Sequence, residues 1–202
     1  NGATSVATFS KAGSGTLTLS ANNTYTGQTN INAGTVSITH NNALGSADGA
    51  SIIASGASLS ISNNITSAEN ITINGTGISS NGAIRNTADD NTLTGLITLA
   101  ANSEIQIDSG SSLTLNPTTG NAITGTYNLT IESVGTSSIN DPIATSTGNL
   151  IKTGAGTLTL SATNTFTGDT TISAGTIKLT GAVNAATDLI IASGATLDLQ
   201  ST

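Results

Sequence analysis

The chain of 202 residues has no cysteine, methionine or tryptophan, and it has only two tyrosines and two phenylalanines. Without cysteine, neither a disulfide framework nor a cysteine-ligated zinc cluster is available. Aromatic residues make up 2% of the chain, and a wide globular core normally needs such large side chains as fillers. No apolar run approaches the roughly 18 residues that a membrane-spanning helix requires. We therefore expect no direct insertion of this segment into a membrane.

Charge is also scarce, because charged residues account for only 7% of the chain, and eleven acidic against four basic residues give a net charge of −7. Four scattered cations cannot form a patch that neutralises phosphates, which excludes nucleic acid as a partner. The hydrophobic content of 36% is nevertheless too high for a disordered chain. What is present is Leu, Ile, Val and Ala interspersed with Thr, Ser, Asn and Gly, a composition typical of short strands and turns.

The sequence contains a long internal repeat. Residues 11–39 and 152–180 align without gaps and agree at 19 of 29 positions. The segment IIASGASLSI at 52–61 returns as IIASGATLDL at 190–199. Weaker versions of the same alternating pattern fill residues 40–151 and 181–202. The chain therefore reads as one repetitive body over residues 1–202, with two strong repeats and weaker coils around them.

The spacing of the apolar segments predicts a solenoid. Segments such as G-T-L-T-L begin at Gly15, Gly34 and Gly56, at intervals of 19 and 22 residues. A single short strand cannot bury its apolar face, whereas coils stacked about 4.8 Å apart bury it as a ladder. We expect an all-β fold: a right-handed parallel β-helix (β-solenoid) of about 9–10 coils with three short sheets, forming a rod roughly 45–50 Å long. The alternative, two tandem β-sandwiches, would need longer strands and a bulky aromatic core.

The repeat carries a resemblance to a known family. The motif G-x-G-T-L-T-L-S-x-x-N-T-(Y/F)-T-G-x-T-x-I-x-A-G-T spans Gly13–Thr35 and Gly154–Thr176. It resembles the passenger-associated repeat of autotransporters, and residues 81–115 resemble the stretch between such repeats. The resemblance implies an exported β-helical arm at the bacterial cell surface. It also implies an upstream signal peptide and a C-terminal β-barrel translocator that anchors the arm in the outer membrane. Because Leu197–Thr202 read as a strand without a polar cap, we expect a fragment of a longer chain.

The sequence assigns no catalytic, cofactor-binding or metal-binding residue. His40 reads as an exposed turn residue without a recognisable triad. Arg85, Asp89 and Asp90 form the densest charge cluster, which is either a calcium-assisted polysaccharide-cleaving site or a local ion pair on a loop. Glu104 and Asp108 share one strand face, yet general acid–base work would need them to flank a cleft.

Two further patterns have structural as well as functional readings. Tyr25 and Phe166 occupy the same repeat position, either as a stacking platform for a glycan or as a ring that covers the corner of a coil, and we take the latter. Several Asn-x-Thr triplets could accept N-glycans in a eukaryotic secretory pathway. In a solenoid they are more simply turn and ladder residues; they begin at Asn22, Asn64, Asn70, Asn74 and Asn128.

The sequence is compatible with three functions. The favoured one is a structural and adhesive surface arm, not an enzyme, whose partners are protein or glycan molecules on host or neighbouring cells. The second is a β-helical polysaccharide-degrading enzyme or glycan-binding module. The third is an ice-binding β-solenoid, suggested by Thr-x-Thr at 16–18, 24–26, 157–159 and 165–167. Ice binding needs threonines stacked in register on successive coils, and these four triplets fall in two distant clusters.

Overall fold

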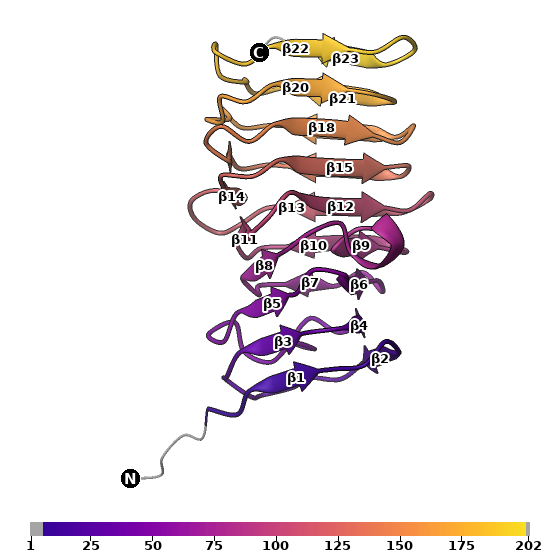
Figure 1. Ribbon diagram of the computed structural model, residues 1–202, viewed down its shortest axis with the longest axis vertical. Coiled ribbons are helices and arrows are strands. Elements are labelled where there is room, and N and C mark those ends of the chain that lie inside the picture. Colours follow the sequence, from indigo (N-terminus) through magenta and orange to yellow (C-terminus); the bar gives the residue numbers. More distant parts are fainter. Residues whose placement is uncertain (1–5, 201–202) are drawn as a thin grey trace.

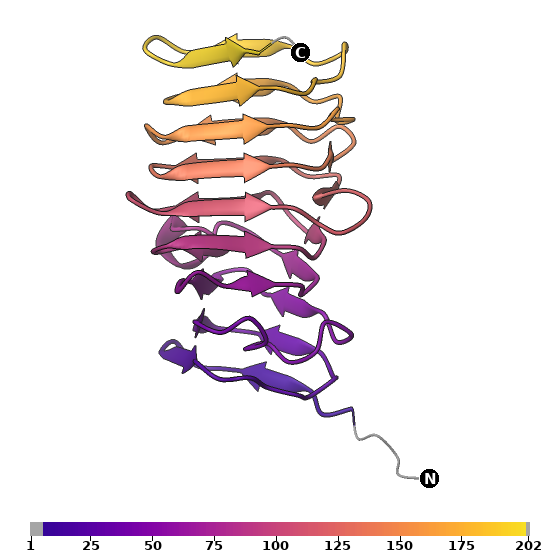
Figure 2. The same cartoon turned by 180° about the vertical axis from the view of Figure 1, so that it is seen from behind.

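The computed structural model describes residues 6–200 and shows a parallel β-solenoid in which the chain climbs from one end of the stack to the other (Figure 1). Figure 2 shows the same regular stack from behind. All the strand pairs are parallel, and they form sheets of seven, nine and seven strands. Within the described residues, the one helical element is a 3-10 turn, η1 (Ile78–Ser80), and no helix is long and apolar enough to cross a membrane.

The strands fall on three faces of the solenoid. Sheet A contains β1 (Phe9–Lys11), β3 (Thr29–Ile31), β5 (Ser51–Ile53), β8 (Ile71–Ile73), β11 (Ile97–Leu99), β14 (Ile123–Gly125) and β17 (Ile143–Ala144). Sheet B contains β2 (Thr16–Leu19), β4 (Gly34–Ile38), β6 (Ala57–Ile61), β9 (Ile84–Asn86), β12 (Ser103–Ile107), β15 (Leu129–Ser133), β18 (Leu150–Thr153), β20 (Thr170–Ile172) and β22 (Leu189–Ile191). Sheet C contains β7 (Thr66–Ser67), β10 (Asp90–Leu93), β13 (Ser112–Leu115), β16 (Thr136–Ile139), β19 (Thr157–Leu160), β21 (Thr176–Leu179) and β23 (Thr196–Leu199).

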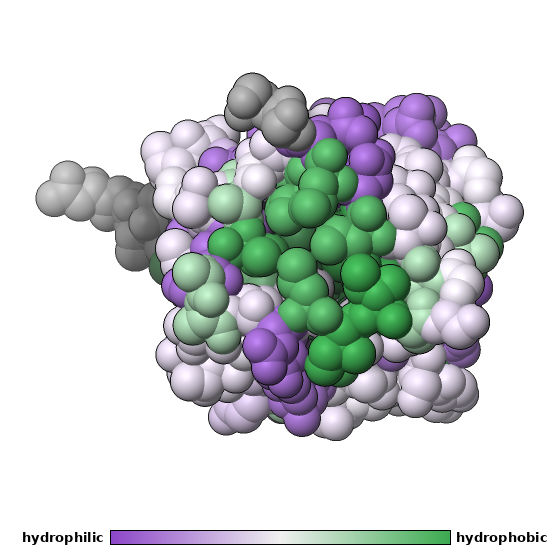
Figure 3. Space-filling view, turned by 90° about the horizontal axis from the view of Figure 1, so that it is seen from above, coloured by the Kyte–Doolittle hydropathy of each residue, from purple (hydrophilic) through white to green (hydrophobic). Residues whose placement is uncertain are grey.

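The core is a set of aliphatic ladders that run along the stack, and apolar residues gather at the centre of the end view in Figure 3. In sheet B, Leu17 pairs with Val36 and Val36 with Leu59, so the three apolar segments predicted to start successive coils do stack as neighbours. Alternation along each strand sends these residues inward and the intervening Thr and Ser outward. The predicted all-β parallel solenoid with three sheets is confirmed, with about nine turns. The parallel pairing excludes the alternative of two antiparallel sandwiches.

The two strong repeats occupy different faces of the solenoid. In the first copy the segment T-L-T-L is β2 of sheet B, whereas in the second copy it is β19 of sheet C. The following strand shifts in the same way, from β3 of sheet A to β20 of sheet B. The repeat therefore defines a strand–arc–strand unit that is not tied to one face of the solenoid, because both placements require the same alternation of apolar and polar residues.

An aromatic ring stands inside the arc of each copy, where the third face has no strand. Phe166 is fully buried, which excludes it as a platform for a glycan. Tyr25 is half-buried and stacks on Phe9, with ring centroids 6.0 Å apart. A ring at this position fills the space that a strand would otherwise occupy. This agrees with its interpretation as a corner-covering residue.

The aromatic side chains of the two arcs differ by one hydroxyl, and this difference gives a paired prediction. The Tyr25 hydroxyl lies 2.7 Å from Thr29 Oγ1, which also donates to the Leu44 carbonyl at 3.3 Å. Phe166 has no hydroxyl, and the buried Oγ1 of the equivalent Thr170 has no hydrogen-bond partner. We expect Thr170→Val to raise the free energy of unfolding by about 0.5–1 kcal/mol and Thr29→Val to lower it by about 1 kcal/mol. Thermal unfolding followed by circular dichroism will compare the two; effects of the same sign would refute this account.

Candidate functional site

Four charged side chains lie on or next to the outer face of sheet B, where β9, β12 and β15 are neighbours. Register places Arg85 beside Gln106 and Gln106 beside Glu132. Glu104 precedes Gln106 on the same face of β12, because side chains two residues apart point the same way. Asp108 follows directly after β12. This face is the candidate functional site, and we call it the charged face.

Arg85 and Asp108 form the ion pair of the charged face. The Arg85 Nη2 atom lies 2.8 Å from Asp108 Oδ2, and Nε lies 3.0 Å from both carboxylate oxygens. Gln106 Nε2 donates to Asp108 Oδ1 at 3.0 Å. Because Asp108 accepts hydrogen bonds from both Arg85 and Gln106, it is positioned as an anchor for Arg85.

The sequence cluster of Arg85, Asp89 and Asp90 does not exist in space as predicted. Asp89 accepts a hydrogen bond from the Asn63 backbone N–H at 2.9 Å, one coil away. Asp90 begins β10 of sheet C and is exposed. In a solenoid the sequence turns a corner within a few residues, whereas the spatial neighbours lie a whole coil away. The assignment of Arg85 to these aspartates was therefore wrong, and its partner is Asp108, 23 residues further along the chain.

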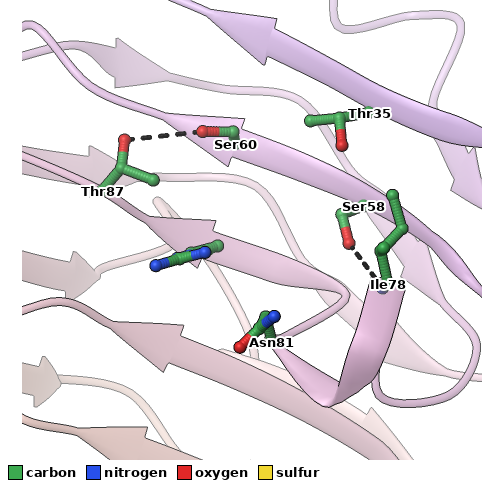
Figure 4. A pocket seen from close by; sticks show the side chains of 7 residues that line it. Thr35, Ser58, Ser60, Ile78, Asn81 and Thr87 are labelled. Atoms are coloured by element: carbon green, nitrogen blue, oxygen red, sulfur yellow. Dashed lines mark hydrogen bonds between the residues drawn. The ribbon is translucent and has the colours of Figure 1, made fainter. Parts of the chain in front are cut away.

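A small hollow lies beside the ion pair, between sheet B and the loop 74–82 that carries η1 (Figure 4). Its volume is about 170 Å³. Ile78 N–H donates to Ser58 Oγ at 3.0 Å and fixes the loop over the sheet. The lining is hydroxyl-rich with one cation and no carboxylate; it consists of Thr35, Ser58, Ser60, Ile78, Asn81, Arg85 and Thr87. Such a surface can offer hydrogen bonds to a sugar or peptide, but its lining holds no acid–base pair.

His40 lies in a turn, as the sequence predicts, although it is half-buried and not fully exposed. Its Nδ1 atom accepts a hydrogen bond from the Asn42 backbone N–H at 3.2 Å, and its carbonyl accepts from Ala43 N–H at 3.1 Å. These contacts give the imidazole a local role in shaping the turn.

Asparagine side chains form ladders along the stack. Asn102 Oδ1 accepts a hydrogen bond from the Asn128 backbone N–H at 3.0 Å. In the same way, Asn128 Oδ1 accepts from the Asn149 backbone N–H at 2.9 Å, and Asn149 Oδ1 accepts from the Asp169 backbone N–H at 2.9 Å. Asn70 accepts from Leu96 N–H in the same manner. Each amide oxygen thus satisfies a backbone donor of the next coil at a corner. These contacts support the ladder interpretation of the Asn-x-Thr triplets.

Sequence reasoning missed a buried carboxyl group, that of Glu69. Its side chain is only 3% exposed and accepts a hydrogen bond from Ser51 Oγ at 2.8 Å. Burial raises its pKa to about 7, against the smaller lowering effect of the Ser51 hydrogen bond. An isolated Glu among Ser and Thr gave no pattern that marked it as internal.

The raised pKa of Glu69 predicts a pH-dependent stability. Because the folded-state pKa is above the ordinary value of 4.5, the contribution of this group is greatest below pH 4.5 and is lost as the pH rises through about 7. We expect Glu69→Gln to leave the melting temperature unchanged at pH 4 and to raise the free energy of unfolding at pH 8 by about 1–2 kcal/mol. Asp90→Asn, at an exposed position, is the matched control. Equal effects of both variants at pH 8 would contradict this assignment.

The backbone carbonyls that surround the ammonium groups of Lys152 and Lys11, which we call the lysine cages, are a second feature that the sequence did not reveal. Lys152 on β18 points inward and is fully buried. Its Nζ atom donates to the carbonyls of Ser133, Thr153, Gly154 and Ala174, which belong to three successive coils. The equivalent Lys11 makes a smaller set of contacts, to the carbonyls of Ala12, Gly13 and Ala33. The lysine that opens each repeat is thus a structural clamp on the glycine turn that follows it.

Comparison with known proteins agrees with this architecture. Residues 9–38 and 150–179 match the family described as passenger-associated-transport-repeat. The Adhesin BmaC autotransporter of Brucella suis biovar 1 (strain 1330) is 32% identical over 174 residues, which is 86% of this chain and 4% of the relative's length. No solved structure gives a significant match.

The fold and the two repeats together define a class: the chain is a parallel β-solenoid with two segments that match the passenger-associated-transport-repeat family. More particularly, it is similar to a short portion of the autotransporter adhesin of Brucella suis. The predicted resemblance is confirmed.

Proposed function

We propose that this chain is a surface-exposed segment of an autotransporter passenger, with a structural and adhesive role and no enzymatic activity. The observation that carries the proposal is the pair of passenger repeats within one uninterrupted stack. The similarity to a protein named as an adhesin supports it. In this proposal the arm is held at the cell surface by its own outer-membrane translocator and contacts protein or glycan on host or neighbouring cells.

Adhesion can be measured with fluorescent beads coated with the chain. We expect them to bind to cultured epithelial cells or extracellular-matrix layers well above beads coated with an unrelated β-rich protein. The same preparation should release no product from a panel of acidic polysaccharides. Turnover that disappears in Arg85→Ala or Asp89→Ala would replace this proposal with the polysaccharide-degrading alternative. The absence of both adhesion and turnover would refute an adhesive role for this segment.

One observation favours ice binding as a minor alternative. On the outer face of sheet C, Thr157 and Thr159 stack directly on Thr136 and Ser138 of the preceding coil. The columns of hydroxyl groups on this face therefore extend to the coil before the second cluster of Thr-x-Thr triplets. The sequence alone did not show this extension. Lys178 follows Thr159 in its column, and the first cluster, Thr16 to Thr18, lies on sheet B instead. Thermal hysteresis in a freezing-point measurement would favour this alternative, and its absence would remove it.

A further inference from the structure

Four oxygen-bearing side chains form a rectangle on the charged face. Glu104 pairs with Thr130 across the sheet, and Gln106 pairs with Glu132. Neighbouring parallel strands lie about 4.8 Å apart, and residues of the same face on one strand lie about 6.6 Å apart. Two carboxylates thus stand at opposite corners, with an amide and a hydroxyl at the other two. The three longer side chains, Glu104, Gln106 and Glu132, can reach across the rectangle, whereas the short Thr130 side chain stays at its corner.

Two acceptors in this rectangle have no partner. Gln106 is 8% exposed, and its Oε1 atom has no hydrogen bond. The Gln106 Nε2 atom is engaged by Asp108, so the amide oxygen is turned toward the opposite side, where Glu104 stands. Glu104 Oε1 is likewise buried without a partner. Buried acceptors without a donor are costly, and two that face the same space indicate a group that supplies positive charge between them.

The nearby cations are already committed elsewhere. Arg85 is held by Asp108 through both Nε and Nη2. Burial lowers the pKa of Lys152 to about 8, and the charge of Glu132 opposes this lowering. However, the Lys152 ammonium donates to the inner carbonyls of the glycine turn. Neither group is bonded to Glu104 or to the Gln106 oxygen.

We propose that Glu104, Gln106, Thr130 and Glu132 bind one calcium ion on the outer face of sheet B. Calcium takes several oxygen ligands of mixed charge in flexible geometry, and water completes its coordination shell at an open surface. Two carboxylates and two neutral oxygens match that preference. Histidine and cysteine are not involved, and the described residues hold no group of three or more His, Cys, Asp or Glu side chains that would mark a more conventional metal centre.

The test is calcium titration of the whole chain at pH 8 and 0.15 M NaCl, by isothermal titration calorimetry and thermal unfolding. We expect one saturable site and, at calcium about ten times Kd, a rise in melting temperature of about 3–6 °C. Glu104→Gln and Glu132→Gln should each weaken binding at least tenfold and remove the thermal shift. Asp90→Asn removes the same charge from the outer face of sheet C and should bind within twofold of the unmodified chain.

Loss of calcium binding in Glu104→Gln can be distinguished from loss of folding. Glu104→Gln places an amide donor beside the Gln106 oxygen, so we expect it to fold without calcium and to melt no lower than the calcium-free chain. Absence of saturable binding up to about 10 mM calcium, beyond the range of extracellular calcium modules, would overturn the proposal. So would an equal loss of affinity in Asp90→Asn, which would indicate a diffuse counterion effect. Neither result would affect the proposed adhesive role, which does not depend on calcium.

Discussion

Replacing Gly156 with alanine will strongly destabilise the chain, whereas the same change at Gly15 will be nearly silent. The two glycines are equivalent positions of the repeat, in G-x-G-T-L-T-L. A Cβ at Gly156 would lie 1.9 Å from the Gly135 carbonyl oxygen, 2.7 Å from that of Val134 and 2.8 Å from that of Ser133. A Cβ at Gly15 would meet nothing within 4 Å, because no described coil lies beneath it. The backbone of the coil below, and not the motif itself, makes glycine necessary.

We expect Gly156→Ala to lower the free energy of unfolding by about 3 kcal/mol, at the upper end of overpacking effects, because backbone atoms of two coils must separate. For a chain of this size that corresponds to a fall in melting temperature of about 6–12 °C. Gly15→Ala should stay within about 0.5 kcal/mol of the unmodified chain. Circular dichroism of both variants will decide between these values. Similar losses at both positions would show that the motif, and not the stacking, determines the requirement.

The second large effect is expected at the lysine cages. Lys152→Met keeps an apolar stem of similar length but removes the ammonium, leaving the buried carbonyls of Ser133, Gly154 and Ala174 without this donor. We expect a loss of about 3 kcal/mol in the free energy of unfolding, within the range for removing one partner of a buried charged interaction. Urea denaturation at pH 7, below the lysine pKa of about 8, measures it with the ammonium protonated.

Lys11→Met is the matched control, because Lys11 is the same residue of the first repeat, is half-buried and contacts carbonyls of only two coils. We expect a loss of about 1 kcal/mol or less there. If Lys152→Met were as stable as the unmodified chain, the cost of removing the ammonium from water would equal the benefit of its hydrogen bonds. The clamp would then have no net stabilising role.

The sequence predicted the fold well because its signals are local and repeated. Alternation in Thr16–Leu19 and Gly34–Ile38 specifies which side chains face inward, and the interval between such segments specifies the coil. The face on which a segment lies could not be predicted. The three faces impose the same alternation, so T-L-T-L fits sheet B in one copy and sheet C in the other. The face on which a segment lies depends on the summed lengths of all the strands and loops that precede it.

The site was predicted less well, because its contacts lie one coil apart. Arg85 seemed close to Asp89 in the sequence, yet its partner Asp108 is 23 residues away. Gln106 gave no signal as an uncharged residue, although its orphaned oxygen is the best indication of a ligand. The sequence likewise did not indicate that Glu69 and Lys152 are buried, since an isolated charged residue usually lies at the surface. Only the register of the stack reveals what these side chains meet.

All the coils form one continuous stack that separates the two repeats. The chain has no cysteine, so spin labels can be attached at Thr16→Cys and Thr171→Cys, on the outer face of sheet B. Seven strand-to-strand steps separate β2 from β20, which predicts a distance of about 34 Å by double electron–electron resonance. Moving the first label one coil to Thr35→Cys should shorten it by about 4.8 Å. A broad distribution, or no shortening on that move, would contradict the continuous solenoid.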